Sequence, residues 1–366
     1  MNSAEQMYAV GLNDIVETLM DTGTEVTYLI QGHMGTGKSE LLKMLIKKLG
    51  ATHLGCYCDC TTKDLGDITI PNIAKMDDGT GYVTYLTNEE LGMHINKPIV
   101  LMLDEYGKAN KAVKNALLRV ILERKIGSYE LHPDSIVFAT TNLGAENVGD
   151  KLEPHQRNRV STLLARKPTA EEWLVDFAIP NGLNPSVMGF AKEYPHIFQG
   201  FEEVKDPSDN PYIFHPREER AAFITPRSLH TASKILTKGV NMSEHALHAA
   251  LIGAIGARGA LDLMAFVTMA NQLPSIESIK QDPAGAKVPD GASAVCMTVF
   301  KVLGAMEREL INPWMDYMGR LSKEAQAMFV QGAMNPDYKF HTDIVRNGKF
   351  GQWAIENNYM FTADKK

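Results

Sequence analysis

The sequence predicts an α/β fold with a parallel sheet in its first half, followed by an all-helical second half. In the first half, apolar and β-branched runs typical of buried strands alternate with segments whose apolar residues repeat at helical spacing. Past residue 167, helical patterns continue, including a long apolar stretch at 246–273. The strand-like runs are 26–30, 98–105 and 135–142, and the helical segments between them are 41–49 and 112–124.

The composition is that of a compact globular chain, since 44% of the 366 residues are hydrophobic and 22% are charged. This length predicts two or more domains. Lys and Arg number 37 against 44 Asp and Glu, and the resulting charge of −7 argues against a nucleic-acid coat, although a local basic channel stays open. The apolar stretch 249–257 is shorter than the roughly 20 residues of a membrane helix. Residues 1–19 carry acids where a signal peptide is basic, so we expect a soluble, cytoplasmic protein without a membrane partner.

Four cysteines form no secreted disulfide framework. Cys56, Cys58 and Cys60 alternate in GCYCDC, so on a strand they share one face. A metal site is the alternative, but common sites pair ligands spaced by two to four residues, and only His53 lies close by. We therefore expect buried strand thiols.

The strongest signal is a phosphate-binding loop between the strand at 26–30 and the helix at 41–49. Its glycines turn backbone amides toward phosphates, and the helix N-terminus adds positive potential. We expect Lys38 to reach the β and γ phosphates and the Ser39 hydroxyl to ligate magnesium. An unrelated glycine-rich turn is not favoured, because both flanks fit. The loop consists of Gly32, His33, Met34, Gly35, Thr36, Gly37, Lys38 and Ser39.

Polar residues end the two later strands, where open α/β sheets place ligands. We expect Asp104 to hold magnesium through its water shell and Glu105 to act as the general base that polarises water. Such a pair is a weak signal alone and gains weight from the upstream phosphate loop. Asn142 ends the next strand and either contacts the γ phosphate and attacking water or caps a turn; both readings stay open.

Three arginines lie further along the chain. Arg157 and Arg159 follow the last predicted strand, and Arg227 lies in ITPRSL, where Pro226 opens a helix. A lone arginine is usually a solvated surface charge. Only the order of the whole set of motifs singles these three out.

In this order the motifs resemble the AAA+ ATPases, and within them the MoxR-like family. The segment DCTTKDLGDITIP resembles the family's strand and DL-x-x-D loop, LMLDEYGKANKAVKNALLRVILE its DE-x-x-(R/K)-A helix, and SIVFATTN its sensor 1 strand. The insert ITIPNIAKMDDGTGYVTYL and a hairpin before sensor 1 are also family-like. LPSIESIKQDP is similar to the tail of phage and bacterial relatives. The resemblance covers residues 20–275 and is thinner beyond.

The resemblance implies an ATPase that uses ATP and Mg²⁺. It makes Lys38 and Ser39 the P-loop ligands and Asp104 and Glu105 the Walker B pair. It makes Asn142 the sensor 1 residue.

It also assigns the arginines. Arg227 matches the sensor 2 arginine, and Arg159 matches the family's Asp-Arg-Phe arginine, the finger that acts on a neighbouring subunit. Arg157 is the reserve candidate. The chain reads Asn158-Arg159-Val160 there and so departs from the family pattern.

The implied architecture has three regions and a ring. The regions are an αβα AAA+ core at 1–165, an all-helical lid with sensor 2 at 166–283, and a helical C-terminal extension without an assigned task at 284–366. The implied ring is a homo-oligomer, expected to be a hexamer, with ATP between subunits. A von Willebrand factor A domain protein is the implied adaptor.

Remodelling or assembly of a protein client is the leading function. A DNA or RNA motor is the alternative, because related helicases use the hairpin before sensor 1 on DNA. Here KIGSYELHPD offers only Lys125 as a cation against Glu130 and Asp134, a poor grip on phosphates. A nucleotide-gated scaffold with little turnover is the second alternative. Adenine is not distinguished from guanine by any compact motif.

Overall fold

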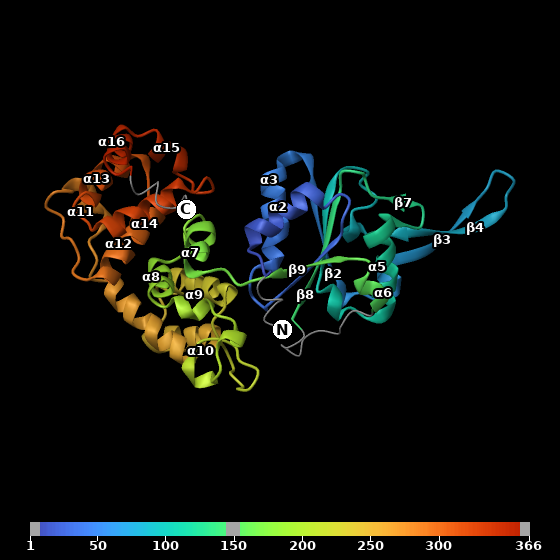
Figure 1. Cartoon of the computed structure of the whole chain (residues 1–366), viewed down its shortest axis with the longest axis horizontal. Coiled ribbons are helices and arrows are strands. Elements are labelled where there is room, and N and C mark those ends of the chain that lie inside the picture. The colour runs from blue at the N-terminus through green and yellow to red at the C-terminus, as the bar shows by residue number, and fades with distance from the viewer. Residues whose placement is uncertain (1–7, 144–153, 359–366) are drawn as a thin grey trace. The chain divides into compact units, whose positions relative to one another are not determined.

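The computed structural model describes residues 8–143 and 154–358 and divides into two compact units between Lys167 and Pro168 (Figure 1). The first is an α/β unit around a parallel sheet and the second is helical. The predicted class, an α/β P-loop core followed by helical structure, is confirmed. A further division at residue 283 stays a prediction.

A five-stranded parallel sheet forms the centre of the first unit, in the order β2-β5-β8-β1-β9. Strands β5 and β8 are buried along their whole length. Because both faces of the sheet are covered, these strands read as continuous apolar runs. The sequence does not predict β9, a partly exposed edge strand without such a run. The strands are β1 (Tyr28–Gly32), β2 (Leu54–Asp59), β5 (Ile99–Asp104), β8 (Ile136–Asn142) and β9 (Ser161–Ala165).

Helices cover both faces of this sheet. The helices α2 (Leu12–Thr22) and α3 (Leu41–Leu49) pack with Val100 and Met102 of β5 in one core cluster. On the other face, α5 (Lys111–Glu123) packs with the alternate residues of β5, Leu101 and Leu103. Since successive side chains of a strand point to opposite faces, even-numbered residues of β5 face α3, the helix that follows the phosphate loop.

The cysteines of β2 lie on the α5 face. Cys56 and Cys58 are buried there, as predicted for strand thiols, and Cys60 is buried just beyond the strand. The residue between them, Tyr57, therefore points to the α3 face. Within the described residues, no group of three or more His, Cys, Asp or Glu side chains is arranged to hold a metal ion.

Two antiparallel hairpins extend the first unit. Strands β3 (Thr69–Lys75) and β4 (Gly81–Thr87) form a long hairpin that projects from the unit after the short helix α4 (Leu65–Ile68) (Figure 1). The second hairpin is short, with β6 (Lys125–Ile126) and β7 (Tyr129–Glu130). A one-turn helix, α6 (Pro154–Arg157), precedes β9.

The second unit is built on one hydrophobic core that runs from Ala170 to Trp353. This core joins residues of the predicted lid to residues of the predicted C-terminal extension. Its largest fully buried side chains include Trp314, Tyr317 and Phe329. The helices are α7 (Ala170–Glu172), a π-helical turn (Trp173–Ala178), α8 (Pro185–Glu193), α9 (Pro226–Lys238), α10 (Glu244–Ala270), α11 (Ile276–Gln281), α12 (Ala292–Gly304), α13 (Arg308–Met318), α14 (Lys323–Met334), α15 (His341–Val345) and α16 (Gly348–Glu356).

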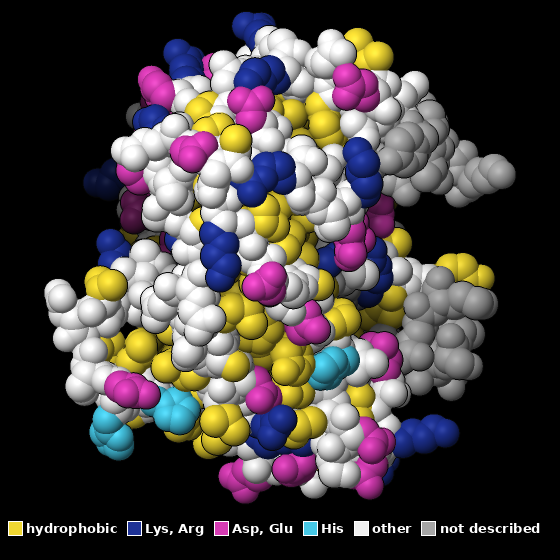
Figure 2. Space-filling model, turned by 90° about the vertical axis from the view of Figure 1, so that its left-hand side faces the viewer, with side chains coloured by type: hydrophobic (Ala, Val, Ile, Leu, Met, Phe, Trp, Pro, Cys, Tyr) yellow, Lys and Arg dark blue, Asp and Glu magenta, His cyan; other side chains and the backbone are white. Residues whose placement is uncertain are grey.

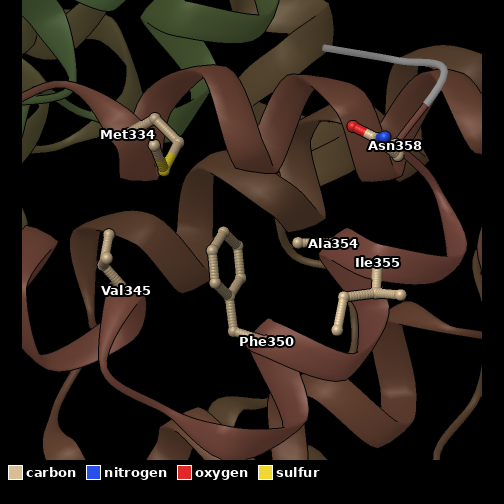
Figure 3. Close-up of a pocket in the computed structure, with 6 residues that line it drawn as sticks. All are labelled: Met334, Val345, Phe350, Ala354, Ile355 and Asn358. Atoms are coloured by element: carbon tan, nitrogen blue, oxygen red, sulfur yellow. The ribbon is translucent and has the colours of Figure 1, made fainter.

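A shallow cavity of about 460 Å³ opens among the C-terminal helices (Figure 3). Its lining carries no charged side chain and none of the predicted site residues. Apolar side chains also reach the surface in Figure 2, where they lie among charged ones. The cavity is lined by Met334, Val345, Phe350, Ala354, Ile355 and Asn358.

Helix α10 is long and apolar enough to cross a membrane, which by itself is weak evidence for a span. Its backbone breaks at Gly256, where φ is 78° and ψ is 162°, so two shorter helices meet there. Each part is well below the roughly 20 residues of a membrane helix. Leu251, Leu263 and Phe266 lie in the core of the unit. The cytoplasmic location stays a prediction.

The break in α10 generates a stability prediction. A Cβ on Gly256 would lie 2.7 Å from the carbonyl oxygen of Ala222, in a backbone region that only glycine adopts readily. Gly256→Ala is therefore expected to lower the free energy of unfolding by about 1–3 kcal/mol. Urea denaturation of the full chain measures this change.

Gly253 is the matched control, because it lies one turn earlier, has helical backbone angles and leaves open space for a Cβ. Gly253→Ala is expected to raise stability by about 0.5–1 kcal/mol. Equal effects of the two substitutions would contradict the assigned break.

Candidate nucleotide-binding site

The predicted phosphate loop lies between β1 and α3, as its flanks require. Gly35 and Gly37 have φ values of 71° and 104°, which glycine adopts without the strain of a side chain. A Cβ on Gly32 would lie 2.9 Å from the carbonyl oxygen of Ala165 on β9, so this position also needs glycine. The loop enters a short 3-10 turn at Lys38 and then α3 at Leu41.

Lys38 is buried inside this loop. Its Nζ donates hydrogen bonds to the carbonyl oxygens of Gly32 and His33, both at 2.8 Å, and to Oδ1 of Asn142 at 2.7 Å. These acceptors are uncharged. The ammonium group therefore lies at the centre of the loop, beside the end of β8.

The register of the sheet brings the predicted residues together. Gly32 of β1 pairs with Asn142 of β8, so the loop starts next to that asparagine. Even-numbered residues of β8 share the α3 face, since Ile136 and Phe138 pack in the same cluster as α3. Thr140 and Asn142 continue this face into the site. Asp104 reaches it from β5 by the same alternation.

Four donors surround the Asp104 carboxylate, which is buried. At Oδ2 the hydroxyl of Tyr57 donates at 2.9 Å and that of Ser39 at 3.5 Å. At Oδ1 the Thr140 hydroxyl donates, and the backbone N–H of Glu105 donates at 3.2 Å. Asp104 is thus oriented from both oxygens and adjoins Ser39, the other predicted magnesium ligand.

Glu105 leaves the strand through a left-handed backbone conformation, with φ of 52°. This conformation is uncommon outside glycine and clusters at functional sites. Its Oε1 accepts a hydrogen bond from Nδ2 of Asn142 at 3.2 Å, and its Oε2 lies 3.0 Å from Nζ of Lys108. A continuous polar chain therefore joins Lys38, Asn142, Glu105 and Lys108.

Two residues of the site, Tyr57 and Thr140, escaped sequence reasoning, and a third, Lys108, fills the (R/K) position of the DE-x-x-(R/K)-A pattern but was given no role. Tyr57 alternates with the buried cysteines of β2, and Thr140 precedes Asn142 by two positions, so strand alternation is the signal that finds both. Lys108 follows Glu105 by one helical turn and belongs to a 3-10 helix at Tyr106–Lys108. Burial, followed by the hydrogen bond to Asp104 and nearby negative charges, raises the pKa of Tyr57 above its ordinary value, so its hydroxyl keeps the proton that it donates.

None of the contacts described for this cluster involves Arg157 or Arg159, and Arg227 belongs to the second unit. Arg157 ends α6 and Arg159 lies in the turn that follows, both exposed. Arg227 is exposed in the first turn of α9, where Thr225 caps the helix and Pro226 takes the first helical position. Since α9 belongs to the second unit, the part of Arg227 in the site stays a prediction, as does the finger role of Arg159.

The residues present fit a nucleotide phosphate with magnesium. Glycines at positive φ open the loop backbone, and Lys38 supplies a buried cation. The hydroxyl of Ser39 and the carboxylate of Asp104 are oxygen ligands, the kind that Mg²⁺ prefers. Glu105 follows Asp104 and contacts Asn142, and its carboxylate can accept a proton.

No protein-family model matches the chain, and no curated protein matches it. Among solved structures, the chain is similar to Hsp104 in a closed state with ATPγS and casein, at 18% identity and a TM-score of 0.35 over 70% of this chain. That match spans 44% of the Hsp104 chain, less than half of its length.

The chain is also similar to the Holliday junction branch migration motor RuvB of Thermotoga maritima, at 14% identity and a TM-score of 0.35, over 75% of each chain. NtrX from Brucella abortus in complex with ADP matches at 14% identity and a TM-score of 0.36, over 95% of this chain and 68% of that one. All three TM-scores lie below 0.5.

Proposed function

We propose that this protein hydrolyses ATP to ADP and phosphate with Mg²⁺, as an AAA+ ATPase of MoxR-like type. One observation carries the proposal: Lys38, Asn142 and Glu105 form a hydrogen-bonded chain beside the Ser39 and Asp104 pair. A phosphate-binding cation, a candidate general base and two magnesium ligands meet in one place.

The phosphate loop binds and orients the triphosphate. Lys38 exchanges its bonds to the carbonyl oxygens of Gly32 and His33 for bonds to the β and γ phosphate oxygens, whose charge makes them stronger acceptors. The Ser39 hydroxyl, and Asp104 through water, would hold magnesium, which would supply positive charge to the phosphate oxygens. Asn142 keeps its place beside Lys38 and so lies near the γ phosphate.

Glu105 activates water. Its carboxylate accepts the proton of the water that attacks the γ phosphorus, while the bond from that phosphorus to the β–γ bridging oxygen breaks. Asn142 and Lys108 orient this carboxylate from its two oxygens. We assign Arg159 to the neighbouring subunit's nucleotide in a ring, with Arg157 in reserve, and Arg227 to the nucleotide of its own chain.

A protein client, rather than a nucleic acid, fits the β3–β4 hairpin. Ile73 and Val83 lie directly opposite each other and are 76% and 60% exposed. Exposed apolar patches of this kind mark contacts with polypeptides or membranes. Between residues 69 and 87, Lys75 is the single cation against Asp77 and Asp78. The other exposed large apolar residues of the hairpin are Ile70, Met76, Tyr82, Tyr85 and Leu86.

The short hairpin offers little to a nucleic acid. Lys125, its single Lys or Arg in the segment 125–134, forms an ion pair with Glu130 of the opposite strand at 3.1 Å. A phosphate would have to displace this carboxylate. We therefore propose remodelling or assembly of a protein client by a ring, expected to be a hexamer, with a von Willebrand factor A domain adaptor.

Two variants are expected to impair ATP binding and ATP hydrolysis separately. Lys38→Ala is expected to weaken ATP binding roughly 10- to 100-fold, because it removes charged hydrogen bonds to phosphate. Glu105→Gln is expected to keep binding and lower turnover about 10²- to 10⁴-fold, because an amide cannot accept the proton. Equilibrium binding of a fluorescent ATP analogue and phosphate release measure these effects.

Matched controls are exposed residues that form surface ion pairs. Lys43 of α3 pairs with Glu40, the residue just before that helix, and Glu123 pairs with Arg119 on α5. Lys43→Ala and Glu123→Gln are expected to behave as wild type. Unchanged turnover in Glu105→Gln would overturn the assigned base.

A finger acting across an interface predicts complementation. Arg159→Ala is expected to lower turnover about 10³- to 10⁵-fold, since such fingers contribute this much in related sites. A mixture of Arg159→Ala and Lys38→Ala chains is expected to regain turnover, because some interfaces then carry both an intact loop and an intact arginine. The rate of phosphate release at constant total protein concentration measures the turnover that the mixture regains.

Absence of recovery, together with full recovery in the Arg157→Ala and Lys38→Ala mixture, would move the assignment to Arg157. Each variant measured alone is the baseline.

The exposed apolar residues of the β3–β4 hairpin generate a prediction about client binding. Replacing Ile73 and Val83 by serine removes two exposed apolar side chains from one face of the hairpin. The dissociation constant for fluorescein-labelled casein is expected to rise at least tenfold, because each Å² of apolar contact contributes about 25 cal/mol to binding. Basal ATP turnover is expected to stay unchanged. Asn72→Ser on the opposite face is the control.

A different result favours the alternatives. Turnover stimulated by single-stranded DNA, with binding that falls steeply as salt rises, would favour a nucleic-acid motor. Nucleotide binding without turnover in the assembled wild type would favour a scaffold.

A further inference from the structure

Tyr57 lies at the edge of the candidate site without belonging to any motif. Its side chain is 45% exposed, and its hydroxyl donates to Oδ2 of Asp104 at 2.9 Å. This oxygen is the one that faces Ser39, whose hydroxyl lies 3.5 Å away. Tyr57 therefore binds the carboxylate oxygen that also contacts Ser39, the other predicted magnesium ligand.

The sheet holds Tyr57 in this position. Cys56 and Cys58 are buried against the α5 face and anchor β2 from that side, so Tyr57 must point to the α3 face. The parallel register sets Tyr57 beside Met102 and Asp59 beside Asp104. The phenol thus reaches one strand across and two residues along to Asp104.

The other oxygen of Asp104 is held differently. Oδ1 accepts from the Thr140 hydroxyl and from the Glu105 backbone N–H. These two contacts alone would hold Oδ1 but would not fix the position of Oδ2. A carboxylate oxygen has two lone-pair directions. With one of them taken by Tyr57, the other is left for the side of the Ser39 hydroxyl, which lies 3.5 Å from Oδ2 and would help to hold magnesium.

We propose that Tyr57 is a positioning residue for magnesium, which fixes Oδ2 of Asp104 so that its remaining lone pair faces Ser39. The inference rests on the proposed function and extends it to a residue outside the phosphate loop and the acidic pair. The contact that the hydroxyl of Tyr57 makes in the site is with Asp104. Tyr57 acts through Asp104, as outer-shell partners of metal ligands do.

Tyr57→Phe in the full chain tests this role, because it removes the hydroxyl and keeps the ring. Binding of the fluorescent analogue mant-ATP is measured with EDTA and then across a magnesium titration. We expect unchanged affinity in EDTA and a roughly 10- to 100-fold rise in the Mg²⁺ concentration for half-maximal enhancement. A urea denaturation curve matching wild type confirms that the variant folds.

Tyr28→Phe is the matched control. Tyr28 lies on β1 of the same sheet and its hydroxyl contacts that of Thr22 at 2.8 Å, away from Asp104. It is expected to leave the magnesium titration unchanged. Equal shifts of the half-maximal Mg²⁺ concentration in both variants, or no shift in Tyr57→Phe, would overturn the positioning role of Tyr57 and leave the proposed function standing. Failure of wild type to bind mant-ATP would overturn the proposed function instead.

Discussion

The parallel pairing of β1 with β8, which sets Gly32 opposite Asn142, is the constraint on which the site depends. Through this register the phosphate loop begins beside the end of β8, and Lys38 reaches Asn142 at 2.7 Å. A shift by one residue would turn Asn142 to the opposite face, because side chains alternate along a strand. Burial of both faces of β8 resists such a shift, since it would exchange the two apolar sets that pack on α3 and α5.

The two cores of the first unit therefore have a role beyond stability. On the α5 face, Leu101, Leu103 and the cysteines of β2 pack together. Their burial leaves the alternate residues for the α3 face, and at the strand ends these residues are Tyr57, Asp104 and Thr140. Packing on one side of the sheet thus orients the polar side chains on the other. The strain at Glu105 then places a carboxylate off the strand, where Asn142 and Lys108 hold it.

The second unit is organised around a single hydrophobic core. Its core is continuous from Ala170 to Trp353, so the helices after residue 283 share their packing with those before it. Helix α10 contributes to this core on both sides of its break at Gly256. The β3–β4 hairpin of the first unit differs from this packed core, because it exposes apolar side chains on both of its faces. An isolated two-stranded hairpin is marginally stable in water, which suits a contact element.

By itself the sequence determined the α/β class, the three central strands, the helices at 41–49 and 112–124, and the phosphate loop, because each is written in a local run of apolar spacing and glycine. It also placed Asp104 and Asn142 at strand ends. It did not predict β9, whose partly exposed residues form no run, the hydrogen bonds of Tyr57 and Thr140 to Asp104, or the ion pair of Lys108 with Glu105. Only the tertiary structure decided the contacts of Tyr57 and Thr140 with Asp104, because they join neighbouring strands whose register is not encoded in local spacing. The contact of Lys108 with Glu105 is local, but it depends on the left-handed turn at Glu105 after β5.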